Sequence, residues 1–313
     1  MEQAQISPFD RGFLFGDGIY EGLRSAALPP GRRIIGLHRH INRMAHGLRA
    51  TGIDFDATTL GTLTDQLLDA NKLRDAFIYW QITRGTPDLA IGPVRSRVPP
   101  KTIRPTIFGY CTPLPTLDSQ TEPAVKPACI GLDTRWTRGD IKSVSLLGNI
   151  LAALEAARHG GEEAILVRPA AQTALVTEGT YTNIIIALPR AANGTDLPPP
   201  FDRFDVITPA LESAPMLAGV TRDILLDSEH RIREQAVQML DLANAAEIML
   251  LGTTTMVTSI TTLDGRQIGS GKPGPVARYL LNVLLGAIRS GHDDLPRQRA
   301  TSDRAEVAST SAL

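Results

Sequence analysis

Lys142 is the residue of this sequence best suited to covalent chemistry. The chain has only five lysines, and Lys142 alone stands between apolar or β-branched neighbours, Ile141 and Val144. Burial disfavours the charged form of an amine, and a neutral amine is a nucleophile. The structural alternative is a half-buried lysine whose stem snorkels along an apolar strand end. The remaining lysines occupy polar, proline-flanked or glycine-rich positions: Lys72, Lys101, Lys126 and Lys272.

Two ionisable residues elsewhere could act with such an amine. Glu178 precedes a glycine turn that feeds an apolar strand, and Arg43 shares a helical face with His40, three positions before it. Taken singly, Glu178 could be an exposed turn carboxylate and Arg43 a solvated helix charge. Residues 219–222 begin a predicted helix and residues 252–255 form a Gly-Thr run, and both offer free N–H and hydroxyl donors to a phosphate.

A lysine, an acidic group and two phosphate-binding segments suit one kind of cofactor. Pyridoxal 5′-phosphate carries an aldehyde, a protonatable ring nitrogen and a phosphate, and its sites use a Schiff-base lysine with an acidic partner for the ring nitrogen. The residues alone therefore suggest a pyridoxal-phosphate site as a hypothesis.

Composition excludes several other classes of protein. The 313 residues have a net charge of −1, with 42% hydrophobic and 21% charged residues, so we expect a globular protein with no nucleic-acid or membrane partner. The first eight residues lack a basic region and an apolar run, so no signal peptide is expected. The two cysteines form no CxxC pair, which fits a cytoplasmic location. The histidines at 38, 40 and 46 do not share one helical face, so no metal site is expected.

Helical and strand patterns mix along the chain, which favours an α+β fold. Helices are predicted over 37–49, 57–71 and 275–289 and directly after Lys142, where apolar residues recur at helical spacing. Strands are predicted over 77–83, 106–111, 163–167 and 246–257, with a hairpin at 263–268. We expect an N-terminal domain over 1–113, a linker over 114–124, a C-terminal domain over 125–289 and a disordered tail over 290–313.

The order and spacing of several motifs closely resemble the class IV aminotransferases, the pyridoxal-phosphate enzymes of the D-amino-acid and branched-chain transaminase type. The resemblance covers about residues 10–289. It implies a two-domain fold of type IV, with a small α/β domain before a larger pseudo-barrel domain, and a homodimer that shares substrate loops. The motifs are DRGFLFGDGIYE at 10–21, HINR at 40–43, IYWQITRG at 78–85, DIKS at 140–143, TEG at 177–179, GVTR at 219–222 and LDG at 263–265.

The resemblance also implies roles for the matching residues. Lys142 would form the Schiff base with the cofactor and carry the proton between the substrate Cα and the cofactor, while Glu178 would keep the ring nitrogen protonated. Arg43 would clamp the phosphate, and Tyr20 would line the substrate pocket. The other expected cofactor ligands are Leu217 on the ring face and Val220, Thr221, Thr253 and Thr254 around the phosphate.

The substrate is less clear, because the chain departs from the bacterial D-amino-acid pattern. An Arg-x-His pair that binds the substrate carboxylate in those enzymes is replaced here by Leu89 and Ile91. We therefore expect Arg24, or Arg95 and Arg97 in the 88–104 loop, to bind that group. Position 147 is leucine, as in the D-amino-acid type, where branched-chain enzymes have tyrosine.

The leading prediction is transfer of an amino group between a D-amino acid and a 2-oxo acid, with (R)-amines as further candidate donors. A branched-chain L-amino-acid transaminase and a lyase of the aminodeoxychorismate type are alternative enzymes of the same fold. The non-enzymatic alternative is a cofactor-binding protein without turnover.

Overall fold

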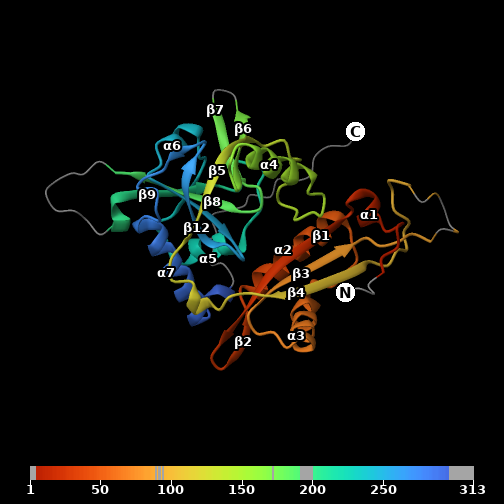
Figure 1. Cartoon of the computed structure of the whole chain (residues 1–313). Coiled ribbons are helices and arrows are strands. Elements are labelled where there is room, and N and C mark those ends of the chain that lie inside the picture. The colour runs from red at the N-terminus through yellow and green to blue at the C-terminus, as the bar shows by residue number, and fades with distance from the viewer. Residues whose placement is uncertain are drawn as a thin grey trace, which may run out of the picture.

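A computed structural model describes residues 5–88, 90, 93, 95–170, 173–190 and 200–295. These residues form two sheets, each with its own helices, which lie side by side in Figure 1. No helix of the described chain is long and apolar enough to cross a lipid bilayer.

The smaller unit is an antiparallel sheet with the strand order β2-β1-β3-β4. Its inward residues alternate along the strands, so that Ile78, Trp80 and Ile82 of β3 pack against helices α2 and α3. The helices predicted over 37–49 and 57–71 are confirmed, the second as a short η1 followed by α3. The elements are α1 Arg11–Phe15, β1 Gly18–Leu28, β2 Gly31–Ile34, α2 Leu37–Thr51, η1 Ala57–Thr59, α3 Leu60–Asn71, β3 Ala76–Thr83 and β4 Thr106–Pro113.

The larger unit is a mixed sheet with the order β10-β9-β8-β11-β12-β5-β6-β7, and β13 pairs with β12. The end strand β7 returns to contact β8 and β9, so the sheet curls into a half-barrel. The predicted α+β fold is confirmed. The elements are η2 Leu117–Ser119, β5 Ala124–Leu132, α4 Leu147–Arg158, β6 Glu163–Ala170, β7 Thr173–Gly179, β8 Asn183–Pro189, η3 Pro200–Arg203, β9 Phe204–Pro209, α5 Val220–Ser228, β10 Arg233–Gln235, α6 Met239–Ala243, β11 Glu247–Gly252, β12 Met256–Leu263, β13 Arg266–Gln267, α7 Pro275–Ser290 and η4 His292–Asp294.

The main core of the larger unit lies between its sheet and helices α5 and α7. Helix α7 contributes Leu280, Leu281 and Leu284, which are almost completely buried, to the same cluster as Leu225 of α5 and Leu251 of β11. The hairpin predicted at 263–268 is confirmed as β12–β13, with Asp264 and Gly265 at positive φ. The chain passes from the smaller sheet to the larger one between β4 and β5. The linker over 114–124 stays a prediction.

The helix predicted after Lys142 has the expected apolar side, but that side does not pack against the core. Helix α4 begins at Leu147, and the side chains at 147, 150, 151 and 154 are 50–67% exposed. The periodicity therefore marks an uncovered surface of the molecule rather than a buried one.

Residues 290–295 lie within the predicted tail, and the structure shows them as the end of α7 and as η4, which contacts the smaller unit. Asp293 in η4 is fully buried; its carboxylate accepts hydrogen bonds from the Gly36 N–H (2.8 Å) and from Arg33 Nη2 (2.7 Å). Helix α2 lacks a capping side chain of its own at Gly36, so two carboxylates of η4 bind its first N–H groups. Asp293 accepts from the Gly36 N–H, and Asp294 Oδ1 accepts from the His38 N–H at 2.6 Å. The rest of the predicted tail, 296–313, lies outside the described residues.

Replacing Asp293 by alanine should lower the free energy of unfolding by about 1–3 kcal/mol, because two hydrogen bonds to a buried charged acceptor are lost. Urea unfolding of the protein measures this change. Asp118→Ala is the matched control, since it breaks an exposed pair with Arg289 that we expect to contribute less than about 1 kcal/mol. Equal losses in the two variants would contradict the capping role.

Candidate active site

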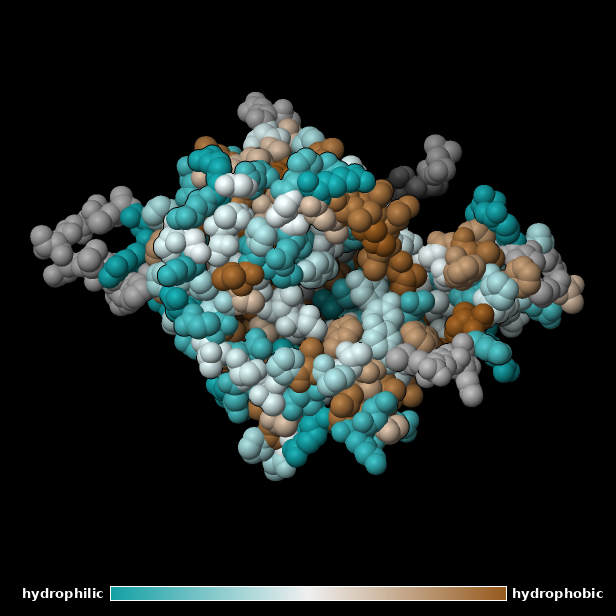
Figure 2. Space-filling model, viewed as in Figure 1, coloured by the Kyte–Doolittle hydropathy of each residue, from teal (hydrophilic) through white to brown (hydrophobic). Residues whose placement is uncertain are grey.

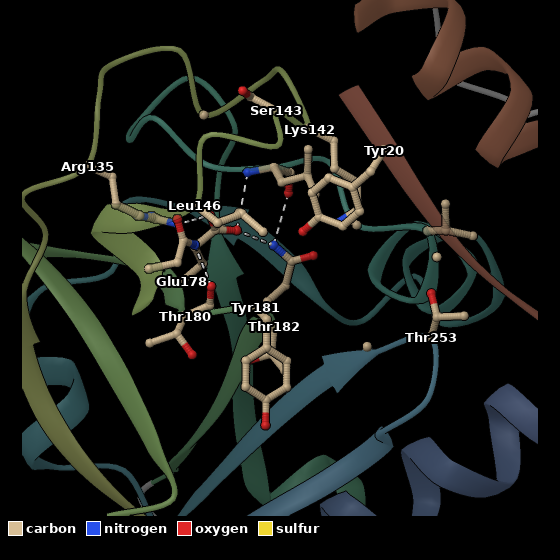
Figure 3. Close-up of a pocket in the computed structure, with 18 of the residues that line it drawn as sticks. Tyr20, Arg135, Lys142, Ser143, Leu146, Glu178, Thr180, Tyr181, Thr182 and Thr253 are labelled. Atoms are coloured by element: carbon tan, nitrogen blue, oxygen red, sulfur yellow. Dashed lines mark hydrogen bonds and ion pairs between the residues drawn. The ribbon is translucent and has the colours of Figure 1, made fainter. Parts of the chain in front are cut away.

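Lys142 lies where the two units meet. The Tyr20 N–H donates to the Lys142 carbonyl and the Val144 N–H to the Gly18 carbonyl, both at 3.0 Å, so the segment around Lys142 runs beside β1. The Lys142 amine is 4.3 Å from the centroid of the Tyr20 ring (Figure 3). The amine is therefore fixed over an aromatic side chain of the other unit at the interface.

Glu178 is the residue before the last of β7, and its carboxylate is buried. Oε1 accepts a hydrogen bond from Arg135 Nη1 at 2.6 Å, and Oε2 accepts from Asn183 Nδ2 at 3.0 Å and from the Leu217 N–H at 3.2 Å. Burial raises the pKa of Glu178, and the neighbouring Arg135 opposes that effect.

Arg43 projects from α2 into a network with Glu21 and His40. Its Nε and Nη2 donate to the two Glu21 oxygens at 2.8 and 2.7 Å, and its Nη1 donates to the Ala218 carbonyl at 2.9 Å. His40 Nδ1 lies 2.7 Å from Glu21 Oε2. Burial raises the pKa of Glu21, but the attraction of Arg43 and His40 outweighs it and lowers the pKa to about 2. The carboxylate therefore fixes the guanidinium in place.

The beginning of α5 and the β11–β12 turn provide donors for an anion. No side chain caps α5, so its first backbone N–H groups are free to bind a ligand. A Cβ on Gly219 would lie 1.7 Å from Asn183 Oδ1, so only glycine lets the helix start approach that strand. In the turn, the Thr255 hydroxyl is buried without a hydrogen-bond partner among the described residues.

These groups line one cavity of about 490 Å³, and Figure 2 shows the surface hollowed between the two units. The cavity brings together every predicted cofactor ligand. They are Arg43, Lys142, Glu178, Leu217, Val220, Thr221, Thr253 and Thr254, and Tyr20 joins them from β1.

The predicted carboxylate-binding arginines do not reach this cavity. Arg24 is 2% exposed and donates to the Pro115 carbonyl at 2.9 Å, so it has a structural partner instead. Arg95 is exposed, with its guanidinium 5.9 Å from the Phe15 ring, and Arg97 is exposed with its carbonyl bound by Arg11. Leu89 and Ile91 lie outside the described residues.

The histidines expected not to bind metal are engaged with separate carboxylates. His38 pairs with Asp294 and His46 with Asp140, while His40 pairs with Glu21. Within the described ranges, no three His, Cys, Asp or Glu side chains gather as a metal site.

Arg135 and Glu21 are site residues that the sequence analysis missed. Glu21 lies inside the 10–21 motif, and its burial beside Arg43 was readable only from its position on the face of β1 opposite Tyr20. Arg135 lies in an irregular loop before Lys142, and no pattern in the sequence points to it.

Comparison with known proteins agrees with this geometry. Residues 18–263 match the family model described as amino-transferase class IV. The chain is 31% identical to a D-alanine aminotransferase of Bacillus licheniformis over 287 residues, covering 90% of this chain and 91% of that protein. It is 30% identical to the D-alanine aminotransferase of Staphylococcus haemolyticus over 284 residues, covering 89% and 90%.

Solved structures show the same fold. The branched-chain amino acid aminotransferase of Escherichia coli superposes with a TM-score of 0.75 at 19% identity, covering 95% of this chain and 93% of that one. The branched-chain enzyme of Thermoproteus uzoniensis, solved with norvaline, superposes with a TM-score of 0.72 at 20% identity, covering 91% of each chain. This chain belongs to the class IV aminotransferases.

Class IV aminotransferases use pyridoxal 5′-phosphate, and the cavity fits that cofactor. An amine, a buried carboxylate and a set of anion donors face the same space, and the partnerless Thr255 hydroxyl lies where a phosphate oxygen could accept from it. The three reactive parts of the cofactor thus each have a counterpart among the lining residues.

Replacing Glu21 by glutamine should lower the free energy of unfolding at pH 7 by about 3–5 kcal/mol, because Arg43 would be a buried cation without its partner. The folded-state pKa of Glu21, about 2, lies below its usual value of 4.5. Its contribution is therefore present above pH 4.5 and is lost as the pH falls towards 2.

The measurement is urea unfolding of wild type and Glu21→Gln at several pH values from 7 to 3. The gap between the two proteins should narrow below pH 4.5. Glu122→Gln, which alters an exposed pair with Arg278, is the control. A gap that stays constant down to pH 3 would contradict the assignment.

Proposed function

We propose that this aminotransferase takes its amino group from a D-amino acid and passes it to a 2-oxo acid. The arrangement of Lys142 and Glu178 around one cavity supports the chemistry, and the D-alanine aminotransferases that cover about nine-tenths of the chain support the donor class. Leu89 and Ile91 in place of an Arg-x-His pair favour a broader range of donors, including (R)-amines.

The residues divide the work as follows. When bound, pyridoxal phosphate supplies an aldehyde that condenses with amines and a ring that accepts the electron pair released at the substrate Cα. The Lys142 amine holds the cofactor between turnovers and then moves the proton on and off the substrate Cα, as a base fixed beside the reacting atom. Glu178 would accept a hydrogen bond from the ring nitrogen and favour its protonated form.

The phosphate would be held by the start of α5 and by the 253–255 turn, with Arg43 beside them. Val220 and Thr221 offer backbone N–H groups, and Thr253 and Thr254 offer further donors. Leu217 would pack on the ring face, and Tyr20, over the lysine amine, would line the substrate side of the cavity.

We also propose that the protein is a homodimer. The exposed apolar side chains of α4 at 147, 150, 151 and 154 form a continuous face, and Figure 2 shows brown atoms gathered where Figure 1 places α4. Large exposed apolar patches mark protein interfaces. A dimer would also let the loop that carries Arg95 and Arg97 reach a partner's cavity, the arrangement under which either could bind a substrate carboxylate.

The cytoplasm is the location we propose for this enzyme. Both cysteines, Cys111 and Cys129, are free thiols in the structure, which fits a reducing compartment.

The donor class is tested by mixing the holoenzyme separately with D-alanine, L-leucine and (R)-1-phenylethylamine. D-alanine should convert the absorbance of the bound cofactor to that of its pyridoxamine form. Lys142→Ala should slow this conversion about 10³-fold or more, because the proton carrier is lost. Borohydride should fix the cofactor to Lys142 in the wild type. Conversion by L-leucine alone would identify a branched-chain enzyme instead.

The dimer is tested by sedimentation of Leu151→Asp. A carboxylate placed in an apolar interface must be desolvated without a partner, so this variant should sediment as a monomer. Leu240→Asp on α6 is the control, because Leu240 is 66% exposed on another surface, and it should remain a dimer. If Leu151→Asp also remains dimeric, α4 is not the interface.

A further inference from the structure

A row of alternating charges runs from the half-barrel sheet to Glu178. Arg168 Nη2 lies 3.4 Å from Asp133 Oδ1, and the Asp133 carboxylate is bound by Arg135. Arg135 in turn donates to Glu178, and Figure 3 shows its side chain directed at that carboxylate. The row therefore ends at the group that we propose pairs with the cofactor ring.

Arg135 is held by both oxygens of Asp133. Its Nε donates to Asp133 Oδ1 at 2.9 Å and its Nη2 to Oδ2 at 3.0 Å, which leaves Nη1 for Glu178. Asp133 is fixed in its turn, because its own N–H donates to the Val167 carbonyl and its Oδ2 accepts from the Thr177 hydroxyl. A planar guanidinium bound in this bidentate way has one orientation, which a lysine could not reproduce.

A neighbouring cation favours the ionised form of the Glu178 carboxylate. Its side chain is 8% exposed, and burial favours the protonated acid. The other two donors to it, the Asn183 amide and the Leu217 N–H, are neutral. Arg135 is the one cationic side chain that hydrogen-bonds Glu178 within the described part of the chain.

The position of Arg135 also argues against a role in binding the substrate. In pyridoxal phosphate, the ring nitrogen and the aldehyde carbon lie at opposite ends of the pyridine ring. Arg135 binds Glu178, the proposed partner of the ring nitrogen. Arg135 is therefore placed at the end of the ring away from the amino donor. The Arg135 guanidinium is also already bound to two carboxylates, through Nε to Asp133 and through Nη1 to Glu178.

We propose that Arg135 is a positioning residue of the aminotransferase reaction, which keeps Glu178 ionised and aimed at the ring nitrogen and is itself oriented by Asp133. This inference depends on the proposed pairing of Glu178 with the ring nitrogen. It assigns to Arg135 a control over how strongly the cofactor ring withdraws electrons, without any contact with substrate.

The test compares reconstituted holoenzymes of wild type, Arg135→Gln, Arg135→Lys and Arg168→Gln. In Arg135→Gln, kcat should fall about 100-fold with little change in KM, because the ring nitrogen loses its ionised partner. The pH at which the absorbance of the bound cofactor changes should move upward, since the ring nitrogen loses its proton when Glu178 is no longer ionised. Retention of the cofactor on dialysis should also fall.

The other two variants separate charge from geometry. Arg135→Lys keeps the positive charge but loses the bidentate bond to Asp133. Its absorbance titration should therefore stay near that of the wild type, while its kcat should lie between those of Arg135→Gln and the wild type. Arg168→Gln alters the outer end of the row, where Arg168 contacts Asp133 and the Arg135 carbonyl but not Glu178. Because its pair with Asp133 is long and partly exposed, this variant should change kcat less than about threefold. If Arg135→Gln does not fold, Arg135→Lys and Asp133→Asn carry the comparison.

A double-mutant cycle with Glu178→Gln decides between the possible failures. If Arg135 acts through Glu178, adding Arg135→Gln to Glu178→Gln should cause no further shift in the absorbance titration. A shift with Glu178→Gln but none with Arg135→Gln would overturn the role of Arg135 alone. No shift with Glu178→Gln would overturn the proposed function of Glu178, and a raised KM without a change in kcat would make Arg135 a substrate ligand.

Discussion

The site depends on the backbone pairing between β1 and the segment that carries Lys142. Two hydrogen bonds of 3.0 Å, from Tyr20 to the Lys142 carbonyl and from Val144 to the Gly18 carbonyl, join the units at the cavity. Because side chains alternate along β1, Tyr20 is directed to the cavity while Glu21 is directed to α2 and Arg43. One strand thus places both the aromatic neighbour of Lys142 and the carboxylate partner of Arg43.

The electrostatics of the cavity follow from pairing each buried charge before a ligand arrives. Glu21 neutralises Arg43, and Arg135 neutralises Glu178. A charge left alone in such a place would lose its proton or gain one, or would draw water into the site. The site is therefore organised in advance, which lowers the cost of ordering it when the cofactor binds.

Sequence reasoning located the residues that lie in motifs and missed those defined only by contacts. Lys142, Glu178 and Arg43 line one cavity, as the order of motifs predicted. Arg24 was expected to bind the substrate carboxylate, but it lies four residues after Tyr20 on β1, a distance of about 13 Å along the strand, and is outside the cavity. Arg135 was missed because its partner Glu178 is 43 positions away, a separation that no local pattern reports. The apolar periodicity of α4 was equally visible, yet periodicity states that a face is apolar and not what covers it.

The capping of α2 by η4 affects when this helix can complete its folding during synthesis. The carboxylate that completes this helix lies 257 positions after the Gly36 N–H that it binds. During synthesis, α2 must therefore leave the ribosome with its first turn uncapped, and contacts of such long range close late in folding. The helix that carries Arg43 therefore gains this bond only after residue 293 has emerged from the ribosome.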